Sequence, residues 1–243
     1  RRNYLVWLYR RTGNGLMSIS NKMMMAASGV GGYLPPNATI LASFSSPSAN
    51  PNGLTWADGN LISCDNGADT IYIHDGFSST ISSSFSSPSS NPSGLAFDGS
   101  NLISADFTSD RIYIHSGLTS SVTSSFSSVS NAPGGLTIAN GNLISCELNT
   151  ETIYVHDGIS STILTSFPSP GGSTGSPRGL AFDGTNLISC DHVRDRIYVH
   201  DGISSTILSS FASPASDPSG LAFDGDNLIS CSFASDTIYK HGK

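Results

Sequence analysis

The sequence predicts an all-β fold, and three observations support this prediction. A block of about 41 residues recurs, because one motif repeats its histidine at positions 74, 115, 156, 200 and 241. Each copy contains short runs rich in β-branched and aromatic residues, separated by turn signals such as Asp-Gly. Charged residues make up only 12% of the chain, and no segment shows the period of an amphipathic helix.

One copy of the repeat divides into four predicted strands. In the second copy we expect these strands at 94–99, 101–106, 111–117 and 120–126. Asp-Gly pairs between them supply the positive φ that tight turns require. The first strand contains glycine and alanine, which suits a strand crowded at the axis of a small ring.

The number of strands predicts that the ring is closed. The first three strands of the repeat occur five times, whereas the fourth strand occurs four times and once more ahead of the first copy, at 38–44. If this early strand pairs with the last strand, residues 38–243 form a five-bladed β-propeller with four-stranded antiparallel blades. The alternative is an open solenoid, which would need atypical polar repeats at both ends.

Residues 1–37 do not repeat and are predicted to be a separate basic extension. They carry five basic residues and no acid, whereas 38–243 carry six basic and eighteen acidic residues. This acidic body argues against nucleic acid as a partner of the propeller. No stretch is long and apolar enough to predict a transmembrane helix. We expect the basic extension to be solvated or to dock the propeller onto a larger assembly.

The four cysteines are not expected to form disulfides. Cys64, Cys146, Cys190 and Cys231 occupy one position of the repeat, and Ala105 takes this position in the second copy. Equivalent positions of neighbouring blades are spread apart by the size of the repeat, whereas a disulfide needs Cα atoms within about 7 Å. We therefore expect four small, buried hydrophobic side chains.

The repeat resembles the NHL-type and YVTN-type propeller repeats. The order Pro-x-Gly-Leu-Ala-Phe-Asp-Gly, then Asn-Leu-Ile-Ser and a hairpin containing Ile-Tyr, carries this resemblance over 38–243. It implies a propeller and no single function, because such propellers serve as binding modules, scaffolds and occasionally enzymes. The segment 17–36 resembles the short leaders of bacteriophage tail or virion proteins, which implies a place on a virion.

The repeated histidines are predicted to be structural. A metal ion needs ligands that converge on one point, and five equivalent positions on the third strand stand on a wide circle. We expect each histidine to be hydrogen-bonded within its own blade. No metal and no cofactor are predicted. The phenylalanines that end the fourth strands are predicted to pack between blades, at 44, 85, 126, 167 and 211.

Pairs of acidic residues flank the turn between the second and third strands. The pairs are Asp65 and Asp69, Asp106 and Asp110, Glu147 and Glu151, and Asp191 and Asp195, and the fifth copy keeps only Asp236. These carboxylates are candidate ligand-binding groups, for Ca²⁺ among others. Capping of the free N–H groups of the turn is the favoured interpretation.

One polar cluster is not repeated along the chain. It consists of Asp191, His192, Arg194 and Arg178 in the fourth copy, near the longer loop at 168–179. Because binding sites are normally asymmetric, these four residues are the first candidates for contact with a ligand.

The predicted function is a non-enzymatic binding or structural module. Its expected partner is a protein or glycan surface, and a virion or another extracellular surface is the favoured location. Two alternatives stay open: a multivalent lectin with one sugar site per blade, and a metal-dependent enzyme of the lactonase or lyase type with a metal on the axis.

Overall fold

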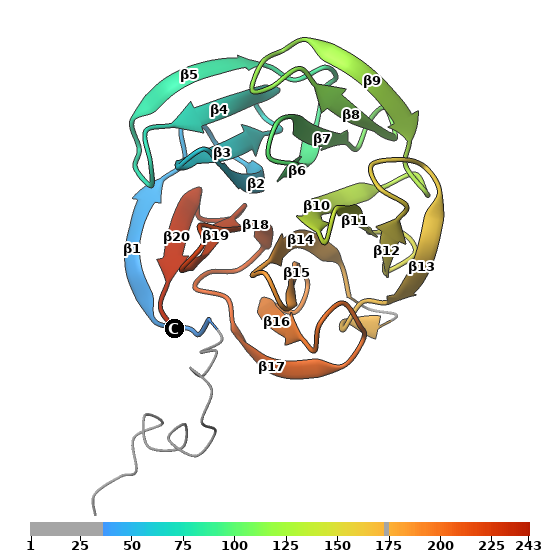
Figure 1. Cartoon of the computed structure of the whole chain (residues 1–243). Coiled ribbons are helices and arrows are strands. Elements are labelled where there is room, and N and C mark those ends of the chain that lie inside the picture. The colour runs from blue at the N-terminus through green and yellow to red at the C-terminus, as the bar shows by residue number, and fades with distance from the viewer. Residues whose placement is uncertain (1–35, 173–174) are drawn as a thin grey trace, which may run out of the picture. The chain divides into compact units, whose positions relative to one another are not determined.

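The computed structural model of the chain describes residues 36–172 and 175–243. Within these residues, twenty strands form five four-stranded sheets around one axis (Figure 1). The predicted all-β fold, a five-bladed β-propeller with antiparallel blades, is confirmed. Among the described residues, no helix is long and apolar enough to cross a membrane.

Each blade places its strands in the same order from the axis outward. The innermost strands are β2 (Pro51–Ala57), β6 (Pro92–Phe97), β10 (Pro133–Ala139), β14 (Pro177–Phe182) and β18 (Pro218–Phe223). The second strands are β3 (Asn60–Asp65), β7 (Leu102–Asp106), β11 (Asn142–Glu147), β15 (Leu187–Asp191) and β19 (Leu228–Ser232). The third strands are β4 (Thr70–His74), β8 (Arg111–His115), β12 (Thr152–His156), β16 (Arg196–His200) and β20 (Thr237–His241). The outermost strands are β5 (Ile81–Ser86), β9 (Val122–Ser127), β13 (Ile163–Pro168), β17 (Ile207–Ala212) and β1 (Ile40–Ser45). We number the blades 1 to 5 by their innermost strands, β2, β6, β10, β14 and β18.

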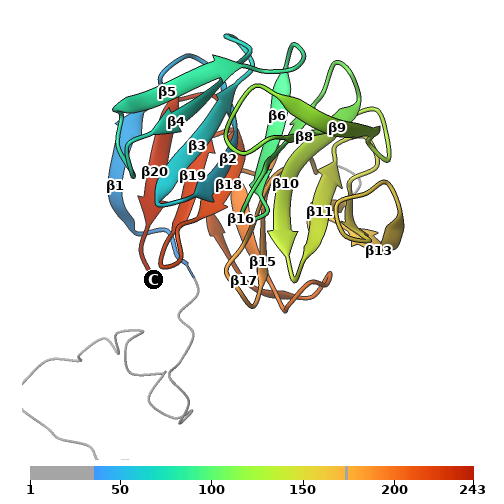
Figure 2. The ribbon, with the colours of Figure 1, turned by 45° about the horizontal axis from the view of Figure 1, so that its top comes forward.

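Blade 5 is completed by the early strand β1. This strand pairs antiparallel with β20, so that Phe44 lies opposite Ile238, and both ribbon views show the two strands side by side (Figures 1 and 2). Beyond the strands, the N–H of Asn37 donates to the carbonyl oxygen of Gly242 at 3.1 Å. The predicted closure is confirmed. Because strands from both ends of the ring lie in one sheet, the outer side of β20 is hydrogen-bonded to β1 and is not a free strand edge.

Several strands begin or end two residues from their predicted positions. β6 begins at Pro92 because this residue already lies opposite Asp106 in the ladder. A proline can occupy this first position since it only has to offer its carbonyl group. β8 ends at His115 because Gly117 turns the chain with a φ of 64°.

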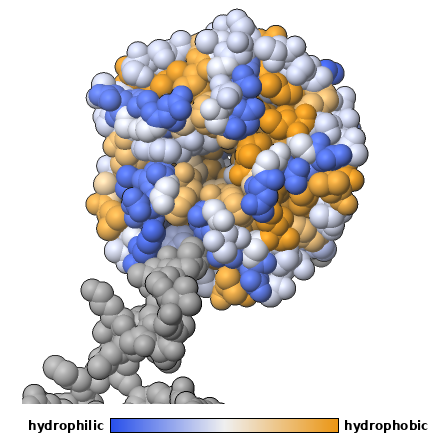
Figure 3. Space-filling view, in the orientation of Figure 1, coloured by the Kyte–Doolittle hydropathy of each residue, from blue (hydrophilic) through white to orange (hydrophobic). Residues whose placement is uncertain are grey.

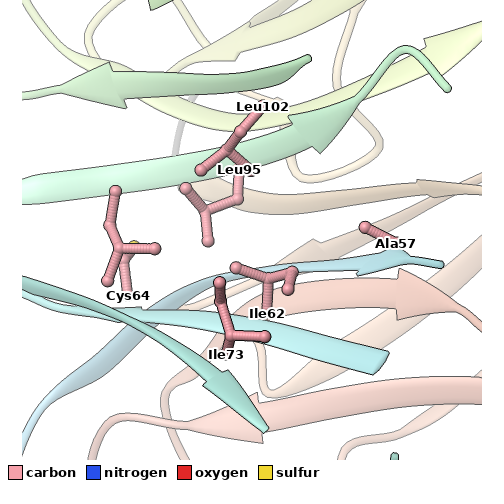
Figure 4. Close-up of a cluster of buried hydrophobic side chains, with 7 residues drawn as sticks. Ala57, Ile62, Cys64, Ile73, Leu95 and Leu102 are labelled. Atoms are coloured by element: carbon pink, nitrogen blue, oxygen red, sulfur yellow. The ribbon is translucent and has the colours of Figure 1, made fainter. Parts of the chain in front are cut away.

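Five hydrophobic clusters form the core, and each lies between two neighbouring blades. In the cluster between blades 1 and 2, Ile62 and Ile73 pack with Leu95 and Leu102 (Figure 4). The other four interfaces contain equivalent residues. Because burial of one such side chain is worth about 1.5–3 kcal/mol, contacts between blades stabilise the ring as a whole.

The four cysteines are free and buried in these clusters, as predicted. Their sulfur atoms accept hydrogen bonds from the innermost strands, and Cys64 Sγ lies 3.1 Å from the backbone nitrogen of Gly53. Burial raises the pKa of the Cys231 thiol to about 11, so the thiol is protonated at neutral pH.

The innermost strands approach each other at the axis through glycine residues. A Cβ atom on Gly53 would lie 2.9 Å from Gly94 Cα of the next blade, and the equivalent glycines of the other blades are similarly enclosed. A side chain here would push the blades apart, which explains the small residues predicted for this strand.

Candidate functional site

The repeated histidine of each blade belongs to a buried hydrogen-bond relay. In blade 1, Nδ1 of His74 lies 2.8 Å from the carbonyl oxygen of Ser78, and Nε2 lies 2.9 Å from Ser63 Oγ. Since a carbonyl oxygen only accepts, the proton is on Nδ1 and the serine hydroxyl donates to Nε2. The same relay recurs at His115, His156, His200 and His241. The predicted hydrogen bonding of these histidines is confirmed.

The five histidines are fully buried and neutral. Burial lowers the pKa of each imidazole below its usual value. Each ring also packs against the phenylalanine of the preceding blade, and the Phe44 and His74 centroids are 5.5 Å apart. These phenylalanines therefore pack between blades, as predicted. Blade 5 differs in one respect, because His241 donates to the carbonyl oxygen of Asn37 from the start of the described chain.

The first acid of each predicted pair lies at the end of a second strand and is buried. Asp65 Oδ1 accepts the backbone N–H groups of Gly67 and Ala68 at 2.9 and 2.8 Å. Asp106 and Asp191 make the same two turn bonds. Glu147 differs, since its Oε2 accepts the hydroxyl of Ser130, and burial raises its pKa.

The second acid of each pair adopts a positive φ, between 49° and 53°, at Asp69, Asp110, Glu151, Asp195 and Asp236. Three of these carboxylates also reach the next blade. Asp69 accepts the N–H of Asn91 at 2.9 Å, and Asp195 and Asp236 form the equivalent bonds. The structure thus uses these acids to shape the turn and connect blades, while ligand binding by them stays a prediction.

A cavity of about 130 Å³ opens at the end of the axis where the innermost strands begin. We call this cavity the mouth. It is lined by Asn52, Asn66, Asn91, Ser93, Phe107, Pro133, Gly134, Leu148, Arg178 and Phe233.

Most of the mouth comes from two positions of the repeat. One is the second residue of the innermost strand, which reads Asn52, Ser93, Gly134, Arg178 and Ser219 through the five blades. The other is the residue that follows the second strand, which reads Asn66, Phe107, Leu148, His192 and Phe233. Both positions vary in every or nearly every copy, whereas Leu61, Ile62 and Ser63 of the adjacent strand are identical in all five copies. The copies therefore differ at the mouth and agree beside it.

The predicted corner of blade 4 is brought together beside this mouth. Arg194 lies 3.8 Å from Asp191, and His192 Nδ1 lies 3.6 Å from Asp217 of the link to blade 5. Of the four predicted residues, Arg178 alone lines the cavity among the described residues, and its guanidinium lies 5.8 Å from the centre of the Phe233 ring. Burial and the nearby Arg178 charge lower the pKa of His192.

The opposite end of the axis has a different lining. Its cavity of about 120 Å³ is bordered by residues such as Trp56, Phe97, Phe182 and Phe223, and no charged residue lines it. Figure 3 shows a hollow at the centre of the ring with hydrophobic residues around it. Leucine recurs in all five copies here, it is followed by threonine or alanine, and an aromatic residue then follows in four copies, so this end belongs to the repeated frame.

Sequence reasoning missed most of the mouth. Phe107, Leu148 and Phe233 gave no chemical motif, yet the sequence contained a signal, since they stand at a position where the copies disagree. Asp217 was also missed, because it lies in the link between blades. No group of three or more His, Cys, Asp or Glu side chains that could hold a metal is present within 36–172 and 175–243.

Comparisons with known proteins show the fold. No protein-family model matches the chain, and no curated protein matches its sequence. A glutaminyl cyclase from Myxococcus xanthus superimposes with a TM-score of 0.72 at 14% identity, covering 85% of this chain and 96% of that chain.

Two further solved structures are propeller domains. The WD40 β-propeller domain of Doa1 gives a TM-score of 0.54 at 14% identity, covering 78% of this chain and 62% of that chain. The β-propeller domain of Cps50 (Swd1) from Myceliophteria thermophila gives 0.53 at 10% identity, covering 86% of this chain and 100% of that chain. At such identities the likeness establishes a propeller and leaves function to the site.

Proposed function

We propose that the propeller is a non-enzymatic binding module that engages a protein partner through the mouth and the turns around it. The observation that carries this proposal is the contrast between the copies. Folding does not require these equivalent positions to carry different residues, and the mouth combines amides, aromatic rings and one arginine. An asymmetric lining on a symmetric frame is what recognition of one particular partner requires.

A protein partner fits the exposed side chains at this end better than a glycan. Phe107 is 38% exposed and Val193, in the turn of blade 4, is 61% exposed. Exposed aromatic and aliphatic groups beside an arginine are typical of the buried centres of protein interfaces. In the lectin alternative each blade would offer the same site, but the repeated carboxylates already accept backbone hydrogen bonds in several blades.

One similar solved structure is a glutaminyl cyclase, which is an enzyme, so the experiment below also tests an enzymatic alternative. His192 stands at the mouth position of the repeat in blade 4, 3.6 Å from Asp217, and this pair is our candidate for an acid–base reaction. The proposed placement on a virion or cell surface rests on residues 17–36, and docking by the basic extension rests on 1–37. Residues 1–35 of both segments lie outside the described residues.

Peptide and glycan arrays probed with the full chain test this proposal. The mouth variant is Phe233→Asn, which introduces the residue that blade 1 carries at Asn66. The matched control is Leu208→Ser on the outer strand β17, where blade 1 carries Ser82. We expect peptide binding that weakens about tenfold or more in the mouth variant and stays within about twofold in the control.

Three results would overturn the proposal. The first is no peptide bound with a Kd below about 1 mM. The second is glycan binding that survives the Phe233→Asn change and falls with substitutions in each blade, which would favour the lectin. The third is turnover of a bound peptide that is abolished by His192→Gln, which would make the mouth an active site.

A further inference from the structure

Arg178 is a half-buried cation without a hydrogen-bonding partner. Within the described residues its guanidinium forms no hydrogen bond and no ion pair, and its Nε atom is fully buried. The guanidinium carbon lies over the Phe233 ring, 5.8 Å from the ring centroid. Burial lowers the pKa of Arg178, which means that the surroundings destabilise its charge. A bound anion would stabilise a desolvated positive charge of this kind.

The acids around Arg178 form no ion pair with it among the described residues. The charge of Asp217 favours the charged form of Arg178, but the two side chains form no ion pair, and the Asp217 carboxylate lies 3.6 Å from His192 Nδ1. Asp191 accepts two turn N–H groups and lies 3.8 Å from Arg194. The guanidinium therefore faces the mouth with donors that no acid of the described chain uses.

The remaining lining of the mouth is neutral and largely apolar. Phe107, Leu148 and Phe233 supply hydrocarbon surface, and Asn66 and Asn91 bond to each other through their side chains at 3.1 Å. A volume of about 130 Å³ is close to that of a cavity of about 150 Å³ that holds benzene in another protein. A branched aliphatic group of four carbons is of suitable size.

One positive charge among several carboxylates selects a singly charged anion. Asp217 is close enough to Arg178 to act on its pKa, Asp191 and Asp195 act on the pKa of His192 in the same corner, and residues 38–243 are strongly acidic. A phosphate with two charges would be repelled by these acids, whereas a carboxylate needs one guanidinium and matches its two parallel N–H groups.

We propose that the mouth binds a carboxylate joined to a short apolar group, with Arg178 holding the carboxylate and Phe107, Leu148 and Phe233 surrounding the apolar part. This inference rests on the proposed function, because a peptide C-terminus that ends in an aliphatic residue is one source of such a group. A free branched organic acid is the other source.

The experiment compares three probes by isothermal titration calorimetry with the full chain. The first probe is an N-acetylated peptide of three glycines and a final leucine with a free carboxylate, the second is the same peptide as its C-terminal amide, and the third is 4-methylpentanoate. We expect the free carboxylate to bind about tenfold or more tightly than the amide, because a charged hydrogen bond is lost.

Two arginine variants separate a specific contact from a general loss of charge. Arg178→Ser introduces the residue that blades 2 and 5 carry at Ser93 and Ser219, so the frame accepts it. Arg111→Thr introduces the residue that blades 1, 3 and 5 carry and removes an arginine that bonds Ser125 on the outer side of blade 2. We expect Arg178→Ser to weaken carboxylate binding about tenfold or more, and Arg111→Thr to change it less than twofold.

The probes distinguish failure of this inference from failure of the proposed function. Equal binding of acid and amide, weakened by Phe233→Asn, would overturn the carboxylate site and leave the protein partner in place. Binding of 4-methylpentanoate as tight as that of the peptide, and lost in Arg178→Ser, would support the carboxylate site and overturn the protein partner. Binding of none of the probes would overturn the inference, and the comparison of acid with amide needs no variant to fold.

Discussion

The repeated frame and the mouth of this propeller follow opposite rules. In the frame, which comprises the histidine relays, the clusters between blades and the turn caps, all five copies place similar residues in similar contacts. At the mouth, the copies differ although the backbone is the same. The frame therefore specifies the fold through many equivalent contacts, and the few residues that break the repeat are free to specify a partner.

The largest expected effect comes from opening the frame. Deleting residues 1–45 removes β1, uncovers the edge of β20, and takes away Phe44, which packs against His74 and the cluster between blades 5 and 1. We expect the free energy of unfolding to fall by more than about 5 kcal/mol, measured by urea unfolding. A chain lacking only 1–35 is the control and should unfold like the full chain. If both shortened chains unfold alike, ring closure does not stabilise the protein.

The second largest effect is expected from acid, because the frame buries five neutral histidines. The folded pKa of each lies below the unfolded value of about 6.5, so the unfolded chain binds more protons as the pH falls below about 6.5. Each histidine then lowers the free energy of unfolding by at most about 1.4 kcal/mol per pH unit. Five together give a limit of about 7 kcal/mol per pH unit, until the folded pKa values are reached.

Urea unfolding between pH 7.5 and 5.0 measures this slope. The buried acids Asp65 and Glu147 have raised pKa values, so they oppose the loss at the acid end of this range. A His156→Gln variant should be less stable at pH 7.5 and should show a slope smaller by about a fifth. A free energy of unfolding that stays constant down to pH 5.5 would contradict the neutral relay.

The same contrast explains what the sequence could predict. The five copies reveal the blades, the free cysteines and the structural role of His74 and its equivalents, because repetition strengthens a pattern. Arg178 could be selected because it belongs to a polar cluster that is not repeated in the other copies. Phe107 and Phe233 could not be selected by chemistry, since a phenylalanine after a strand is as common in packing as in binding. Asn66 of blade 1 and Phe233 of blade 5 are far apart in sequence. Only the folded ring brings these variable residues together in the lining of one cavity.

A smaller effect is expected where one blade already departs from the frame. Cys146 accepts the N–H of Gly135 and donates to the carbonyl oxygen of Pro177. In blade 2 the equivalent residue is Ala105, and there Gly94 pairs with it in the strand ladder. We expect Cys146→Ala to cost about 1 kcal/mol, because blade 3 can adopt the pairing of blade 2. A loss above about 3 kcal/mol in urea unfolding would show that the thiol bond is required.

The smallest effect on stability is expected at the mouth, from the substitution that should harm binding most. Arg178→Ser removes a half-buried charge that has no hydrogen-bonding partner, so the gain in solvation offsets the lost packing on Phe233. We expect the free energy of unfolding to stay within about 1 kcal/mol of the original value or to rise. Arg111→Thr, which removes an arginine bonded to Ser125 on the outer strand β9, should instead lower it by about 0.5 kcal/mol. A loss of several kcal/mol in Arg178→Ser would show that this arginine belongs to the frame, and the division between a fold-specifying frame and a partner-specifying mouth would then fail at its central residue.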